Sequence, residues 1–199
     1  LKYRLPISES IITPHKAPLM DAQRAIRIMR YHASEWGFEP DKIGVMGFSA
    51  GGHLASTVST HFDKGQKTAS DPIEQQSCRP DFSILMYPVV SMQDGITHQG
   101  SKEALLGKEP DEERVDKYSN EMQVDENTPP AFLVHASDDG AVPVQNSLLY
   151  YQALQEHEVP AEMHIYTKGG HGFGLGLERG FVSSWTQRCA DWLKLMNKE

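Results

Sequence analysis

The sequence Gly47-Phe48-Ser49-Ala50-Gly51-Gly52 lies between a short apolar run, residues 42–46, and a segment with helical character, residues 53–60. A strand, a sharp turn and a helix, with the pattern G-x-S-x-G at the turn, are typical of a nucleophile elbow. We expect strain at the apical serine, and glycines two residues before and after it, because strand and helix approach closely there. The Ser49 hydroxyl should therefore project from the carboxyl end of a sheet, beside the amide of Ala50 at a helix N-terminus.

The elements around this turn follow the rhythm of a parallel α/β sheet. Apolar runs that predict strands cover residues 42–46, 81–90, 131–135 and 161–166, and residues 3–5 indicate the tail of an earlier strand. Helical spacing covers residues 19–35, 143–156 and 180–196, and in the first of these helices Arg24, Arg27 and Arg30 are expected on the solvated side. Helices that alternate with short apolar strands predict an α/β fold, mainly a parallel sheet with helices on both faces, in a single domain over residues 1–199.

Residues 91–128 interrupt this alternation. They lack strand character, hold short helical pieces around residues 102–106 and 112–118, and are rich in acidic side chains. A long excursion between strands usually carries function, so we expect it to cover an active site.

The net charge and the spacing of apolar, cysteine and histidine residues argue against several classes of binding partner. The formal net charge of −8 argues against nucleic acid or an anionic membrane as the main partner. No apolar run approaches membrane-spanning length. Cys78 and Cys189 lie far apart, and His53 and His61 have no carboxylate or cysteine at ligand spacing, so neither a metal nor another cofactor is expected.

A serine hydroxyl is a poor nucleophile at neutral pH, so it needs a base to accept its proton and a carboxylate to orient that base. Open parallel sheets place functional groups just beyond the carboxyl ends of their strands. Asp139 follows the strand expected at residues 131–135, and His171 follows the one at residues 161–166. Asp138 and Asp139 could both be simple turn formers. Asp139 is favoured because D-x-x-V-P then places Pro143 at the start of the next helix.

His171 is one of nine histidines. It differs from the others because glycines flank it on both sides, which lets the loop bring its imidazole close to the serine. His53 is near Ser49 in sequence, but from the first helical turn its side chain is expected to point away from the hydroxyl. The histidines expected at ordinary exposed positions are His15, His61, His98 and His157.

Three ordered runs, GFSAGGHLAS, AFLVHASDDGAVPVQNS and MHIYTKGGHGFGLG, resemble the acetyl esterase/lipase group of α/β-hydrolases. The likeness covers nearly the whole chain and is greatest to bacterial carbohydrate or xylan esterases. The resemblance implies an α/β-hydrolase fold, with Ser49 as nucleophile, Asp139 as orienting acid, His171 as general base and Ala50 as an oxyanion-hole amide. It also implies a serine esterase that removes short acyl groups, acetate above all, from a small-molecule or carbohydrate ester.

Met92 and Phe173 are candidates for lining the acyl pocket, although both residue types are more often plain packing residues. Two other functions stay open at this stage. One is a serine peptidase of the prolyl-oligopeptidase type, which shares the triad and its order but normally carries a propeller domain. The other is a non-catalytic module with a hydrolase fold.

The chain departs from the family pattern in one respect. A second oxyanion amide usually comes from an HGG-type loop after an earlier strand, and no HGG motif precedes Gly47. We therefore expect that roughly seventy to ninety N-terminal residues of a full-length member, with its first strands, are absent. The nucleophile strand would then lie at a sheet edge, and the rate would fall about a hundredfold or more.

Overall fold

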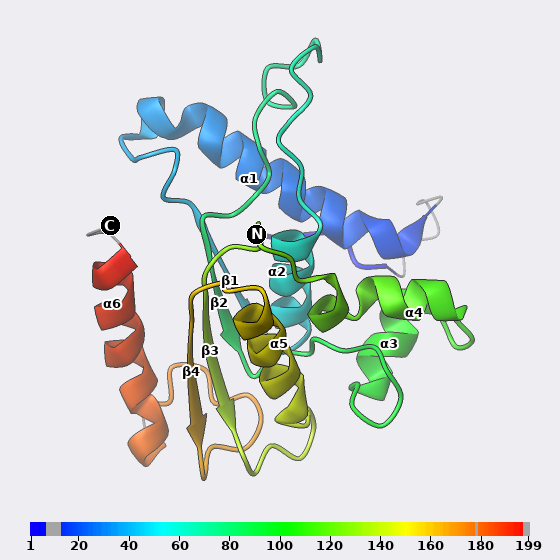
Figure 1. The fold of residues 1–199 in the computed structure, drawn as a ribbon, viewed down its shortest axis with the longest axis vertical. Helices are drawn as coiled ribbons and strands as arrows, with labels where there is room; N and C mark the ends of the chain where they lie inside the picture. Colours follow the sequence, from blue (N-terminus) through cyan, green and yellow to red (C-terminus); the bar gives the residue numbers. More distant parts are fainter. Residues whose placement is uncertain (7–12, 178, 197–199) are drawn as a thin grey trace.

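The computed structural model describes residues 1–6, 13–177 and 179–196 (Figure 1). Its four strands are β1 (Gly44–Phe48), β2 (Phe82–Met86), β3 (Ala131–Ala136) and β4 (Ala161–Tyr166). Its α-helices are α1 (Ala17–Trp36), α2 (Ala50–Thr60), α3 (Gln99–Leu106), α4 (Glu112–Tyr118), α5 (Gln145–Glu156) and α6 (Trp185–Met196). Short 3₁₀ helices cover η1 (Pro14–Lys16), η2 (Asn120–Gln123) and η3 (Gly180–Ser184).

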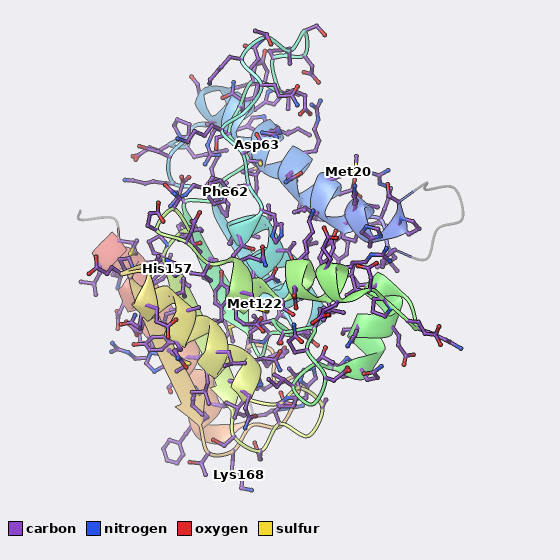
Figure 2. All side chains as sticks on the ribbon, turned by 45° about the vertical axis from the view of Figure 1, so that its right-hand side comes forward. Met20, Phe62, Asp63, Met122, His157 and Lys168 are labelled. Carbon is purple, nitrogen blue, oxygen red and sulfur yellow. The ribbon has the colours of Figure 1, made fainter. Side chains whose placement is uncertain are left out.

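The strands form one parallel sheet in the order β1-β2-β3-β4, which is also their order along the chain. All four carboxyl ends therefore lie at one edge, which is the lower end of the sheet in Figure 1. Lys168, just after β4, lies at this end of the molecule in Figure 2. The predicted parallel α/β fold is confirmed.

Helices cover both faces of the sheet, as predicted, and alternate side chains of the strands separate the two cores. On one face, Ile84 and Met86 of β2 pack in a cluster with Trp185 and Trp192 of α6. On the other face, Leu85 of β2 packs with side chains of α2 and α5. In Figure 1, α6 stands on one side of the sheet, and α1, α2 and α5 stand on the other.

Two predicted strands differ from the structure. Residues 1–5 form no strand, so the prediction of a strand tail at residues 3–5 is wrong. The strand expected over residues 81–90 ends at Met86, because Tyr87 has a positive φ of 36° and Pro88 follows it. The buried residues Val89 and Val90 are apolar because they pack in the core and not because they extend the sheet.

The arginines of α1 do not form a solvated face, which corrects the prediction from helical spacing. Arg27 is buried, and its guanidinium donates to Asp63 and to the carbonyl of Gln76. Arg24 and Arg30 likewise bind carboxylates between α2 and β2, on Asp71, Glu74 and Asp81. The segment between α2 and β2, residues 61–81, extends over α1 in Figure 1, and Asp63 lies beside α1 in Figure 2. These charges therefore fix a loop onto the helix.

Candidate active site

Ser49 stands at the turn between β1 and α2, with φ 52° and ψ −120°. Such a backbone is strained for a residue that carries a Cβ. Three backbone hydrogen bonds hold it: the Ser49 amide donates to the Met86 carbonyl at 3.0 Å, and the Ser49 carbonyl accepts from Val89 at 3.1 Å and His53 at 3.2 Å. The turn is thus tied to the end of β2 as well as to its own helix.

Two glycines are sterically required at this turn, Gly47 and Gly52, and only the first of them was expected. A Cβ on Gly47 would lie 2.0 Å from the carbonyl oxygen of Gly51, and a Cβ on Gly52 would lie 2.7 Å from the Pro88 side chain. A Cβ on Gly51 would meet nothing within 4 Å. The expectation was therefore right for Gly47 and wrong for Gly51, because α2 approaches the Tyr87–Pro88 bend through Gly52.

The structure brings Ser49, His171 and Asp139 together. His171 Nε2 lies 2.9 Å from Ser49 Oγ, and His171 Nδ1 lies 2.7 Å from Asp139 Oδ2. The carboxylate can only accept, so Nδ1 carries the proton and Nε2 is free to accept the hydroxyl proton. The Ser49 side chain makes no helix-capping bond, so its oxygen stays available for this contact.

Asp138 and Asp139 have different partners. Asp139 has no exposed side-chain surface, and its Oδ1 accepts from the amides of Ala141 and Val142, each at 2.9 Å. Burial acts to raise the pKa of Asp139, but these amides and His171 outweigh it, so the pKa is lowered. Asp138 Oδ1 accepts from the amides of Gly169 and Gly170, each at 2.8 Å, and so fixes the loop that carries His171.

Ala50 begins α2, so its amide is one of the first-turn N–H groups that have no acceptor within the helix. An apolar cavity of about 380 Å³ runs along α2 from Ala50 to Thr57 and is lined also by α3, Tyr118 and the start of α1. Met92 lines this cavity and is fully buried. Phe173 does not line it and packs against Tyr87, with ring centroids 4.6 Å apart, and in the cluster under α6.

The other histidines that the sequence singled out lie away from the contact between Ser49 and His171. His53 is buried, and its Nε2 donates to the Tyr118 carbonyl at 2.8 Å, so it takes no part in the contact with Ser49. His157 is exposed as predicted, but His15, His61 and His98 are partly buried, and His98 caps α3. Across residues 1–6, 13–177 and 179–196, no three histidine, cysteine or acidic side chains gather in a metal-binding group. Within the same ranges no helix is long and apolar enough to cross a bilayer.

Two residues near the triad escaped the sequence analysis. Tyr87 has a positive φ of 36°, and its ring packs against that of His171 in a T-shaped arrangement with centroids 5.0 Å apart, while its hydroxyl accepts from the Gly174 amide. His135 is fully buried in β3, with Nε2 at 3.3 Å from Asp139 Oδ2. The signal for His135 is its position near the carboxyl end of β3, four residues before Asp139. The signal for Tyr87 is the proline that follows it.

A serine at a strand-to-helix turn, in contact with a histidine and an aspartate beyond the ends of later parallel strands, defines the class of α/β-hydrolases. The chain belongs to the BD-FAE family, whose family model matches residues 2–154. Ser49 and Asp139 lie within the matched residues, and His171 lies beyond them.

Similar proteins are named as esterases and as enzymes that act on xylan or xylosides. The chain is 51% identical to an acetyl ester-xyloside bifunctional hydrolase from Caldicellulosiruptor lactoaceticus, with a TM-score of 0.90 over 92% of this chain and 67% of that one. It is 38% identical to an acetylxylan esterase of Xylanibacter ruminicola and to an endo-1,4-beta-xylanase B of Butyrivibrio fibrisolvens, over 98% and 94% of this chain. The chain spans only 38% and 29% of the length of those two proteins. The predicted resemblance to esterases of the α/β-hydrolase fold is thereby confirmed at the level of the family.

Proposed function

We propose that this protein is a serine esterase that removes short acyl groups, acetate in the first place, from hydroxyl groups of a carbohydrate. The observation that carries the proposal is the contact of Ser49 with His171 and of His171 with Asp139, at 2.9 Å and 2.7 Å, above a strand-to-helix turn. Support for the substrate class comes from the relatives, whose names include acetylxylan esterase and acetyl ester-xyloside hydrolase.

The reaction begins with attack of Ser49 Oγ on the ester carbonyl carbon, while the hydroxyl proton passes to His171 Nε2. The negative oxygen that develops lies at the N-terminus of α2, where the Ala50 amide donates to it. The bond to the sugar oxygen then breaks, and His171 returns its proton to that oxygen. Asp139 keeps the ring in the required tautomer and stabilises the imidazolium that forms.

Hydrolysis of the acyl-serine repeats the same proton transfers. Water loses a proton to His171 Nε2 and attacks the acyl carbon, and the proton then passes to Ser49 Oγ as the acid leaves. The apolar cavity beside Ala50 and Met92 receives the acyl group in this proposal. The segment of residues 91–128 contributes α3 and Tyr118 to its wall, which supports a role as a cover of the site.

A fluorophosphonate probe tests the nucleophile. Wild-type protein should be labelled on Ser49, and Ser49→Ala should abolish both labelling and hydrolysis of p-nitrophenyl acetate. Ser183→Ala, which removes a serine hydroxyl in η3 that donates to the Gly180 carbonyl, is the matched control and should keep both. Release of acetate from acetylated xylo-oligosaccharides then tests the carbohydrate part of the proposal.

A folded wild-type protein that neither reacts with the probe nor hydrolyses any ester from acetate to octanoate would contradict the esterase proposal. Labelling that persists in Ser49→Ala would contradict the nucleophile. Turnover of p-nitrophenyl acetate without release of acetate from the oligosaccharides would restrict the activity to small esters.

A further inference from the structure

A buried polar pair lies behind the carboxylate of Asp139. His135, in β3, and Ser147, in the first turn of α5, have no exposed surface. Ser147 Oγ lies 2.8 Å from His135 Nδ1. Two fully buried polar side chains are costly to place unless their hydrogen-bonding groups are used, so their partners indicate what they do.

The hydrogen bonds fix the tautomer of His135. Its Nε2 lies 3.0 Å from the Val142 carbonyl oxygen, which can only accept, so Nε2 carries the proton. Nδ1 is therefore unprotonated in the neutral ring, and the Ser147 hydroxyl donates to it. Burial lowers the pKa of His135, and the charged or titratable groups that face it are Asp139 and His171. The ring thus remains neutral, with a defined N–H direction.

This N–H group donates to the Val142 carbonyl, and the carboxylate of Asp139 lies beside the same nitrogen. His135 Nε2 is 3.3 Å from Asp139 Oδ2, the same oxygen that accepts from His171 Nδ1 at 2.7 Å. The Val142 amide in turn donates to Asp139 Oδ1. His135 therefore contacts one oxygen of the carboxylate and, through its bond to the Val142 carbonyl, also supports the residue whose amide binds the other oxygen.

We propose that His135, oriented by Ser147, is a positioning residue that fixes the Asp139 carboxylate and through it the ring of His171. The inference rests on the proposed function, since it assigns a role in the same reaction. His135 does not touch the reacting atoms. Its loss lets the carboxylate shift, and small misplacements of a catalytic group lower the rate of the chemical step more than substrate binding.

Two substitutions separate positioning from packing. His135→Gln places an amide N–H the same number of bonds from Cβ as Nε2 and should keep most of the activity. His135→Leu keeps the volume but removes the donor, and should lower kcat roughly tenfold to a hundredfold while KM changes less than about twofold. In His135→Leu the acidic limb of the pH profile of kcat/KM should move to lower pH, because His171 loses part of the support of the carboxylate for its charged form.

Ser147→Ala provides a milder test, because it removes only the donor that orients His135. It should shift the acidic limb in the same direction as His135→Leu, by less. Ser59→Ala is the matched control: Ser59 is equally buried, in α2, and its hydroxyl bonds the Ala55 carbonyl, so it should lose stability without moving the limb. Equal profiles for Ser147→Ala and Ser59→Ala would overturn the role of Ser147.

A proton NMR measurement separates the failure of this inference from the failure of the proposed function. The His171 Nδ1 proton, bonded to Asp139 at 2.7 Å, should give a low-field signal in the wild-type protein and in His135→Gln. The signal should be lost or broadened in His135→Leu. If the wild-type protein hydrolyses no ester but the signals behave in this way, the positioning stands and the esterase proposal fails. An unchanged signal and pH profile in His135→Leu, or an equal loss in His135→Gln, would overturn the positioning.

Discussion

Single residues around Ser49 hold its backbone and the helix that follows it. The strained φ of Ser49 persists because the carbonyl of Met86 and the amide of Val89 bond its backbone from β2 and the segment after it. Behind the elbow, His53 bonds the Tyr118 carbonyl and thereby joins α2 to the end of α4. The fixed geometry of Ser49 thus depends on backbone groups and on a buried side chain that do not contact its hydroxyl.

His53 makes the stability of the protein depend on pH. Burial, together with nearby His61, outweighs the bond to Tyr118 and lowers the pKa of His53 to about 4, from an ordinary value of 6.5. Between these values the unfolded chain binds a proton that the folded protein does not, so stability falls as the pH is lowered from 6.5 toward 4. We expect the wild-type protein to lose about 2 kcal/mol from this group between pH 7 and pH 5.

Urea unfolding of the wild-type protein and His53→Gln at both pH values checks this expectation. Glutamine keeps an N–H for the Tyr118 carbonyl but does not titrate, so the variant should lose less stability on acidification. Other titrating groups are shared by both proteins and cancel in the comparison. Parallel losses in the two proteins would show that His53 does not titrate as expected.

At the scale of elements, the segment between α2 and β2 is held to α1 by arginines. Arg27 is the central one, since its buried guanidinium bonds Asp63 and the Gln76 carbonyl at the two ends of the segment. Within the segment, the Cys78 amide donates to the Asp63 carbonyl and Gln66 to the Glu74 carbonyl. These and further internal bonds, together with the arginines of α1, explain why so polar a sequence has a defined position.

Replacement of Arg27 by Met should release this segment. The Gln76 carbonyl loses its charged donor and Asp63 its partner, so we expect a loss of about 1 to 3 kcal/mol. Amide hydrogen exchange should rise at residues 63–78 and change little in β3. Arg24→Met is the matched control, because the Arg24 side chain is 37% exposed and its ion pairs are worth less than about 1 kcal/mol. Equal effects of the two substitutions would contradict the central role of Arg27.

Much of this arrangement could be predicted from sequence, for reasons that particular residues make clear. The chain order of Ser49, Asp139 and His171, each just after an apolar run, was enough to predict that they meet, because carboxyl ends of parallel strands share one edge. Arg27 was misplaced because helical periodicity cannot detect a distant acidic loop that buries a charge. Gly52 is required, and Gly51 is not, because the side chain of Pro88 lies against Gly52. His135 is oriented by Ser147. Neither contact can be inferred without the tertiary structure.

At the scale of the whole molecule, the two faces of the sheet are covered unequally. Helix α6 packs on β2 and β3, whereas Met46 and Phe48 of β1, on the same face, are 43% and 37% exposed. Within the described residues, β1 also lies at one end of the sheet. An exposed strand edge beside exposed apolar side chains favours association with other chains.

Met46→Lys should therefore reduce self-association of the chain of residues 1–199, measured by sedimentation velocity over a range of concentrations. Its stability should change by less than about 0.5 kcal/mol, because the side chain is already largely exposed. Met122→Lys provides the control, since Met122 is 53% exposed but lies in η2, which packs against α2, α4 and α5. Association that both variants leave unchanged would contradict a role for the strand edge.

The separation of 122 positions between Ser49 and His171 has a consequence for biosynthesis. Translation delivers the segment with the serine long before the loop with its base, and the carboxylate comes between them. A nascent chain released early carries the hydroxyl but no group to deprotonate it. If the proposed mechanism holds, activity toward esters can therefore arise only after the chain has been synthesised and folded as far as His171.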